Sequence, residues 1–248
     1  MAGGPGNDVY YIRQANDIVT ESTSAGTDTV YSYLASYTLG SNVENGRITS
    51  TGTANLIGNG HDNTIYAGAG NNVLNGNSGT DTLSYAYGLT STATAGVTVS
   101  LASTLPQATG GSGTDTLSGF ENLTGSSKND KLTGSTGNNV LDGGLGDDIL
   151  IGGPGKDMLV GGISSDLFDF NALSELGTTS ATWDVIVDFV RGQDRIDLST
   201  LDANTATTAN DAFVGTLISS AASFTAAGQL KLASGVLYGN VDADADAE

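Results

Sequence analysis

The sequence predicts an all-β fold: a solenoid, or roll, of short strands stacked along one axis. A nine-residue unit recurs along the chain, and the segments between its copies alternate polar and apolar residues as strands do. Each unit has six turn-prone residues and three strand-prone ones, which is too short to pack alone. Copies must therefore stack and bury their apolar eighth residues together.

The repeat is most regular between residues 125 and 169, where five copies follow one another without a gap. Their sixth residues are Asp130, Asn139, Asp148, Asp157 and Asp166. A more degenerate block at residues 58–84 places Asn63, Asn72 and Asp81 at the same position. Isolated copies at residues 3–11 and 110–118 add Asp8 and Asp115.

The composition favours cations as partners. The chain has 248 residues, and 27 Asp and Glu against 8 Lys and Arg give a formal net charge of -19. Nucleic acid and anionic membranes require a basic face, so neither is expected as a partner. No cysteine and a single histidine exclude a thiolate or imidazole zinc site. No apolar run is long enough for membrane insertion.

The repeat length also predicts a coil of two units, so that residues 18 apart lie above one another at about 4.8 Å. Asp130, Asp148 and Asp166 then line one edge of the roll, and Asn139 and Asp157 line the other. Two carboxylates at this spacing repel by roughly 3 to 4 kcal/mol at an effective dielectric near 20. A divalent cation between them reverses the sign of that interaction.

Glycines complete the predicted cation sites. A glycine permits positive φ and close backbone approach, so a tight turn can aim successive carbonyl groups at one ion. Calcium tolerates such an irregular oxygen cage better than magnesium does. We therefore expect several calcium ions, held by the sixth-position residues and by Gly144, Gly146, Gly153 and Gly155. For the lone copy at 110–118, a plain glycine turn is an equal alternative.

The stretch GGLGDDILIGGPGKDMLV resembles the repeats-in-toxin (RTX) nonapeptide of bacterial proteins exported by type I secretion systems. FENLTGSSKNDKLTG resembles the entry into such a roll, and GGPGNDVYY with DIVTE resembles another common unit of these exoproteins. WDVIVDFVRGQDRIDLSTLDANT resembles the C-terminal module of serralysin-type metalloproteases. The resemblance implies a parallel β-roll that holds calcium, a capping β-sandwich, a C-terminal secretion signal, and an acidic residue after the last repeat, here Glu175, that closes the last calcium site.

Several residues depart from this pattern. His61 and Ser164 replace fourth-position glycines, so we expect looser turns there and a solvent-facing His61. Met1 and Ala2 before the first repeat resemble an added start, and the end lacks the apolar signal, so a truncated piece is expected. We expect a frayed acidic tail at Asp242, Asp244 and Asp246, and exposed or turn positions at Asp184, Asp188, Asp194 and Asp197.

Four segments are expected: residues 1–57, an N-terminal repeat unit with strands; 58–124, a first degenerate roll; 125–169, the main calcium roll; and 170–248, a truncated capping β-sandwich. Whether the two repeat blocks form one roll or two stays open. No HExxH or GxSxG motif is present, so the chain is expected not to be an enzyme.

The expected function is a secreted, extracellular module that folds on binding calcium and assists export through the type I secretion machinery. An upstream catalytic domain is a possible partner. One alternative is a polysaccharide-binding module that uses the aromatic residues Tyr31, Tyr33, Tyr37 and Trp183. Another is the non-catalytic C-terminal part of a secreted hydrolase, such as a metalloprotease or lipase.

Overall fold

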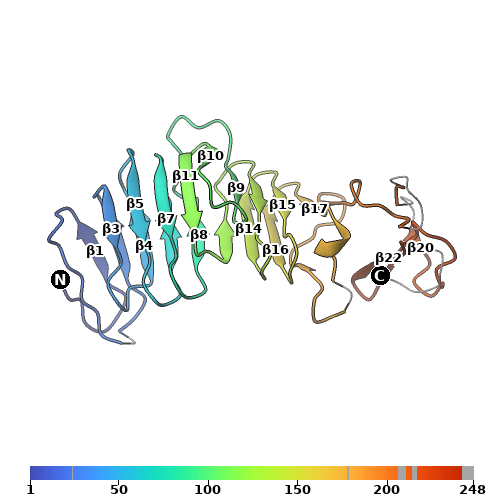
Figure 1. Cartoon of the computed structure of the whole chain (residues 1–248), viewed down its shortest axis with the longest axis horizontal. Coiled ribbons are helices and arrows are strands. Elements are labelled where there is room, and N and C mark those ends of the chain that lie inside the picture. Colours follow the sequence, from blue (N-terminus) through green and yellow to red (C-terminus); the bar gives the residue numbers. More distant parts are fainter. Residues whose placement is uncertain (24, 178, 206–210, 214–216, 242–248) are drawn as a thin grey trace.

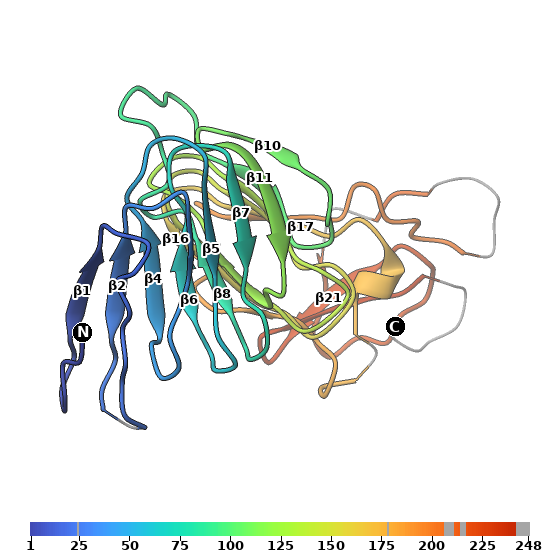
Figure 2. The same cartoon turned by 60° about the vertical axis from the view of Figure 1, so that its left-hand side comes forward.

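The computed structural model describes every residue except 24, 178, 206–210, 214–216 and 242–248. The chain winds into an elongated roll whose coils follow one another from the N-terminus along the long axis (Figure 1). Two faces of strands enclose the core, and Figure 2 shows both faces from the N-terminal side. The predicted parallel β-roll is confirmed.

The first face is one nine-stranded sheet in which every neighbouring pair is parallel. Its strands, in spatial order, are β1 (Val9–Ile12), β2 (Thr29–Ser32), β4 (Asn45–Ile48), β6 (Thr64–Tyr66), β8 (Thr82–Ser84), β12 (Asn122–Thr124), β14 (Val140–Leu145), β16 (Met158–Ile163) and β18 (Val185–Ile186). This sheet runs without a break through both repeat blocks, so the two blocks belong to one roll.

The second face consists of two five-stranded sheets. The first sheet contains β3 (Ser36–Thr38), β5 (Ala54–Ile57), β7 (Asn72–Asn75), β11 (Gly113–Ser118) and β10 (Gln107–Gly110). The second contains β9 (Thr98–Ser100), β13 (Lys131–Thr133), β15 (Ile149–Ile151), β17 (Leu167–Asp169) and β19 (Arg195–Asp197). The hairpin β10–β11 is antiparallel, and a bridge between Val97 and Gly110 links the two sheets.

The predicted 18-residue register is confirmed in the repeat blocks. Leu132 pairs with Leu150, and Leu150 pairs with Phe168, on the second face. Leu141 pairs with Leu159 on the first face. Coils outside the regular repeats have other lengths. Strands β9, β10 and β11 lie between β8 and β12 in the chain, and long connections precede β18 and β19.

The eighth-position residues form the core, as the repeat predicts. The side chains at this position in the two blocks are completely buried, namely Ile65, Leu74, Leu83, Leu132, Leu141, Leu150, Leu159 and Phe168. Burying each such side chain stabilises the fold by about 1.5 to 3 kcal/mol. The stacked strands therefore supply the hydrophobic contribution that single units lack.

The capping β-sandwich is not confirmed. After the short 3-10 helix η1 (Leu173–Glu175), strands β18 and β19 still belong to the two faces of the roll. Beyond them, the described residues form one three-stranded sheet, with β20 (Leu217–Ile218), β21 (Leu230–Ala233) and β22 (Val236–Gly239). Asp242, Asp244 and Asp246 lie outside the described residues.

Candidate metal-binding ladders

The first ladder is a column of acidic and amide side chains that directly precede the strands of the nine-stranded sheet. The backbone N–H of one member donates to the side chain of the next in six places, for example from Asn139 to Asp157 Oδ1 at 2.8 Å. Strand pairing aligns all of its members: Asp8, Asp28, Glu44, Asn63, Asp81, Glu121, Asn139, Asp157 and Asp184.

The second ladder lies at the start of strands β13, β15, β17 and β19 and contains Asp130, Asp148, Asp166 and Asp194. Asp130 N–H donates to Asp148 Oδ1 at 2.7 Å, and Asp148 N–H donates to Asp166 Oδ1 at 2.9 Å. Asp166 N–H donates to Asp194 Oδ1 at 3.1 Å. The predicted stacking of Asp130, Asp148 and Asp166 is thus present.

A third, short ladder contains Asn72 and Asp115. Asn72 N–H donates to Asp115 Oδ1 at 2.8 Å, and the buried hydroxyl of Tyr85 donates to Asp115 Oδ2 at 2.8 Å. Both carboxylate oxygens of Asp115 therefore have protein partners. The isolated repeat at residues 110–118 has the features of a plain glycine turn, one of the two alternatives weighed from the sequence.

Seven carboxylates of the first and second ladders each hold one buried oxygen without a hydrogen-bond donor. This oxygen is Oδ2 of Asp8, Asp28, Asp81, Asp148, Asp157, Asp166 and Asp184. Leaving a buried charged acceptor unsatisfied costs several kcal/mol, and native proteins rarely do so. Hard oxygen donors without N–H partners are the ligands that calcium prefers, so these residues fit the expected ion.

The first glycine of each unit leaves room for these oxygens. A β-carbon at Gly143 would overlap Asp148 Oδ2 and stand 2.7 Å from the carbonyl oxygen of Gly161. The Asp148 carboxylate and a carbonyl group of the next coil therefore converge on the same point. The arrangement recurs at Gly125, beside Asp130 and the Gly143 carbonyl group.

The predicted ligand glycines lie in left-handed turns. Gly144 and Gly153 have φ of 95° and 87°, and Gly146 and Gly155 have φ of 121° and 151°. Ser164 takes the place of such a glycine and keeps φ at 99°, so the turn is preserved at the cost of backbone strain rather than loosened. His61 is exposed, as expected.

The ladders perturb the acidity of their carboxyl groups. Burial, together with the neighbouring carboxylates of Asp130 and Asp166, raises the pKa of Asp148 to about 7, although the hydrogen bond from the Asp130 N–H acts in the lowering direction. Burial also raises the pKa of Asp184 to about 7 and that of Asp81 to about 6. The ionised form of each group is thus disfavoured unless a cation neutralises it.

Asparagine members of the first ladder satisfy themselves without an ion. Asn139 Nδ2 donates to the Glu121 carbonyl oxygen at 2.6 Å, and its Oδ1 accepts from Ser135 N–H at 2.7 Å. Asn63 likewise donates to the Val43 carbonyl oxygen at 2.9 Å. At the positions where the repeat has Asn in place of Asp, the side-chain NH2 group therefore binds a carbonyl oxygen, and no cation is needed there.

Three acidic residues after the last repeat were expected at exposed or turn positions, and the structure shows that this was wrong. Asp184 and Asp194 end the first and second ladders, and Asp194 Oδ2 also accepts from Val190 N–H at 2.7 Å. Asp188 accepts from Gly161 and Gly162 N–H. Asp197 is the last residue of β19, and its Oδ1 accepts from Ser199 N–H in the turn that follows.

Glu175, expected to close the last site, is half-buried, and its charge raises the pKa of both Asp157 and Asp184. It lies close to the end of the first ladder, although its Oε2 accepts from Asn171 N–H at 2.8 Å. Its role as a calcium ligand stays a prediction.

Sequence reasoning missed Asp28, Glu44 and Glu121 because they lie outside the regular repeats. It also treated the fifth position of the unit as free. In fact its side chains bind the N–H of the next coil, as Asn129 does with Asp147 at 3.1 Å and Asp147 does with Ser165 at 3.0 Å. The recurrence of Asn and Asp at this position was the available signal.

Residues 49–85 and 124–159 match the family described as RTX calcium-binding nonapeptide repeat, in four copies. The chain carries RTX repeats. These repeats bind calcium ions, which confirms the expected cation and a calcium-binding module of the kind typical of secreted proteins. The match to the serralysin-type C-terminal module is not confirmed.

The RTX chain is also similar to Endo-1,3-1,4-beta-glycanase ExsH from Rhizobium meliloti (strain 1021). The two are 36% identical over 74 residues, which is 30% of this chain and 16% of the glycanase. The chain thus spans about a sixth of the length of this relative.

Among the helices that the structure describes, none is long and apolar enough to cross a membrane.

Proposed function

We propose that this chain is a module that stays unfolded at low calcium, folds when calcium binds its ladders, and thereby assists export to the extracellular space through the type I secretion machinery. The observation that carries the proposal is the set of seven buried carboxylate oxygens without donors. In the absence of a cation their desolvation and mutual repulsion oppose folding. Calcium binding would offset both, so that binding free energy becomes folding free energy.

The residues proposed to hold calcium are the carboxylates with free oxygens, together with carbonyl groups of the glycine turns. In the second ladder these are Asp148 and Asp166. Asp130 would add a carboxylate oxygen in the turn that begins at Gly125, beside the Gly143 carbonyl group. In the first ladder they are Asp157 and Asp184, with Asp81 further along the sheet. The asparagines, which are self-satisfied, would contribute only through Oδ1.

Protease protection across a range of buffered free calcium tests this proposal. The expected midpoint is about 10⁻⁴ to 10⁻³ M, the range of extracellular calcium modules. Such a midpoint leaves the chain unfolded in a cytosol and folded outside. A midpoint below about 10⁻⁷ M would contradict the export role, since the chain would then fold before it is exported.

We propose further that the chain is a non-catalytic part of a larger secreted hydrolase. The limited match to a protein named as a glycanase supports a hydrolase context. Many of the acidic side chains, which could otherwise serve as acid–base catalysts, are arranged in the ladders, as Asp148 and Asp157 are. Assay of the chain alone on a mixed-linkage β-glucan should give no product, and hydrolysis by the chain would overturn this proposal.

A second candidate function, polysaccharide binding, is favoured by a row of side chains on the outer face of the nine-stranded sheet. Tyr11, Tyr31, Arg47 and Tyr66 are aligned by strand pairing. The rings of Tyr11 and Tyr31 stack at 5.3 Å, and Arg47 lies 3.8 Å from the ring centre of Tyr87. Tyr11 and Tyr87 are 52% and 54% exposed, so their rings are accessible to sugar rings.

Affinity electrophoresis in gels that contain mixed-linkage β-glucan tests this second function. The double substitution Tyr11→Ala and Tyr87→Ala should abolish retardation by the glucan. Tyr33→Ala is the matched control, because Tyr33 is 40% exposed but packs under Arg13 instead of joining the row. Equal retardation of all variants, or none for the unmodified chain, would contradict the function.

A further inference from the structure

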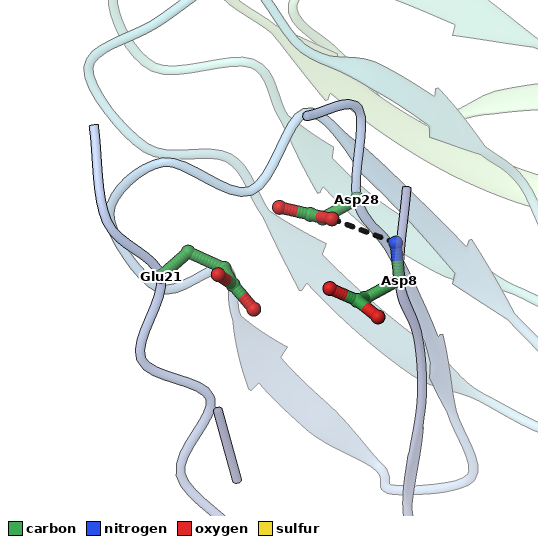
Figure 3. Close-up of side chains that lie close together, drawn as sticks. All are labelled: Asp8, Glu21 and Asp28. Atoms are coloured by element: carbon green, nitrogen blue, oxygen red, sulfur yellow. Dashed lines mark hydrogen bonds between the residues drawn. The ribbon is translucent and has the colours of Figure 1, made fainter. Parts of the chain in front are cut away.

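The N-terminal end of the roll holds a cluster of three carboxylates that includes a residue outside the repeats. Asp8 precedes β1, Asp28 precedes β2, and Glu21 lies in the connection between these two strands (Figure 3). One oxygen of each residue lies within 4.8 Å of the others. Glu21 and Asp28 are 7% and 0% exposed, so the cluster is enclosed rather than spread over the surface.

Buried acceptors in this cluster have no hydrogen-bond donor. Oδ2 of Asp28 and Oδ2 of Asp8 are both buried and unpartnered. The hydrogen bonds in the cluster use other oxygens: Asp8 N–H donates to Asp28 Oδ1 at 2.8 Å, and Gly3 N–H donates to Glu21 Oε1 at 3.1 Å. Three carboxylates at such short range repel one another strongly unless a cation lies among them.

A second, independent observation comes from Tyr10. Its side chain is only 6% exposed, and its buried hydroxyl has no hydrogen-bond partner. A β-carbon placed on Gly3 would overlap both this hydroxyl oxygen and Asp8 Oδ2, so the two oxygens lie side by side. Buried hydroxyl groups normally have a partner, and a bound cation or its water would supply one.

The chemistry of the donors defines the ligand. All candidate donors are oxygens, three of them from carboxylates, which is the ligand set of a hard divalent cation. An irregular arrangement of this kind suits calcium better than magnesium, which requires near-octahedral geometry. Zinc is disfavoured because neither imidazole nor thiolate belongs to the cluster.

We propose that Asp8, Glu21 and Asp28 form a calcium site that fastens the connection between β1 and β2 to the end of the roll. This inference goes beyond the proposed folding function, because Glu21 belongs to no repeat and the ladders could bind their ions without it. The connection is already held at one point, where Asn42 Nδ2 donates to the Glu21 carbonyl oxygen at 3.0 Å. The ion would also bind the side chain of Glu21 and so protect the exposed edge of strand β1.

Native mass spectrometry of the chain in calcium, with hydrogen exchange of the Val9–Ser32 amides, tests the site. Glu21→Gln and Asp28→Asn keep the side-chain oxygens that accept from Gly3 and Asp8 but remove the charge. Each variant should bind one calcium ion fewer than the unmodified chain and lose the calcium-dependent protection of β1 and β2. Asp17→Asn, a half-buried position in the same connection, is the matched control and should behave like the unmodified chain.

Retention of the full number of ions by both variants would overturn the site and leave the folding function intact. Absence of calcium binding to the unmodified chain would overturn both proposals. Loss of several ions together with global loss of exchange protection in both variants would also overturn the inference, since the cluster would then be part of the fold as a whole rather than a separate site.

Discussion

Asp148→Asn should make the calcium-free protein more stable but weaken its binding of calcium. The carboxylate is 1% exposed, its Oδ1 accepts from Asp130 N–H, and its Oδ2 has no donor. In the variant, Oδ1 can still accept, and Nδ2 can donate to a carbonyl group of the preceding coil, as Asn139 Nδ2 does. The substitution therefore removes a buried charge and leaves the other contacts in place.

The magnitude follows from the acidity of the group. Burial raises the pKa of Asp148 from 3.8 to about 7, which corresponds to about 4 kcal/mol of disfavoured charge near neutral pH. Solvent screening at the turn reduces this value, so we expect the variant to be about 2 kcal/mol more stable without calcium. With calcium, the lost carboxylate ligand should weaken binding about tenfold, which is 1.4 kcal/mol.

Folding in a chelator, driven by trimethylamine N-oxide, measures the first effect, and a calcium titration of the protein already folded in trimethylamine N-oxide measures the second. Asp147→Asn is the control: it makes the same change of charge at an exposed neighbouring residue whose Oδ1 accepts from Ser165 N–H. It should shift neither quantity by more than a few tenths of a kcal/mol. If the Asp148→Asn variant is less stable in chelator than the unmodified chain, the buried charge of Asp148 does not oppose folding.

Three further predictions follow. Ser164→Gly should stabilise the calcium-bound protein by about 1 kcal/mol in urea unfolding, because Ser164 holds φ at 99°; an unchanged stability would show that the turn is not strained. Gly143→Ala should raise the calcium concentration at the folding midpoint about tenfold or more, because its β-carbon would overlap Asp148 Oδ2. Gly60→Ala, with nothing within 4 Å of its added carbon, should leave the midpoint unchanged. Equal effects of the two substitutions would show that the oxygens beside Gly143 do not bind an ion. In chelator, the stability of the fold should increase as the pH falls from about 7 towards 5. The folded pKa of Asp148 and Asp184 is about 7, so the folded state binds more protons than the unfolded state over this range. Circular dichroism should show a gain of β structure, and a loss of structure over the same range would contradict the prediction.

The regular part of the fold could be predicted because the repeat alone sets its geometry. A nine-residue period with one apolar position determines both the 18-residue register and the buried column from Leu132 to Phe168. The stacking of Asp148 between Asp130 and Asp166 follows from the same period. No tertiary information is needed for these features.

The ends of the ladders could not be predicted in this way. Asp184 and Asp194 follow the last repeat after connections of irregular length, so no period aligns them with Asp157 and Asp166. Glu44, in the N-terminal half of the first ladder, lies in a coil with no glycine-rich turn motif. The sandwich was expected from resemblance alone and is not confirmed; among the described residues after the last repeat, β18 and β19 extend the roll, and β20, β21 and β22 form one small sheet.

Far-UV circular dichroism of the chain during a calcium titration, with magnesium as the control, shows whether folding depends on calcium. We expect a cooperative gain of β signal with calcium and little change with magnesium, because calcium tolerates irregular oxygen coordination and the ladders offer unpartnered carboxylate oxygens. A spectrum with full β signal in chelator at neutral pH would contradict it. The buried leucine columns would then suffice to fold the roll without any ion.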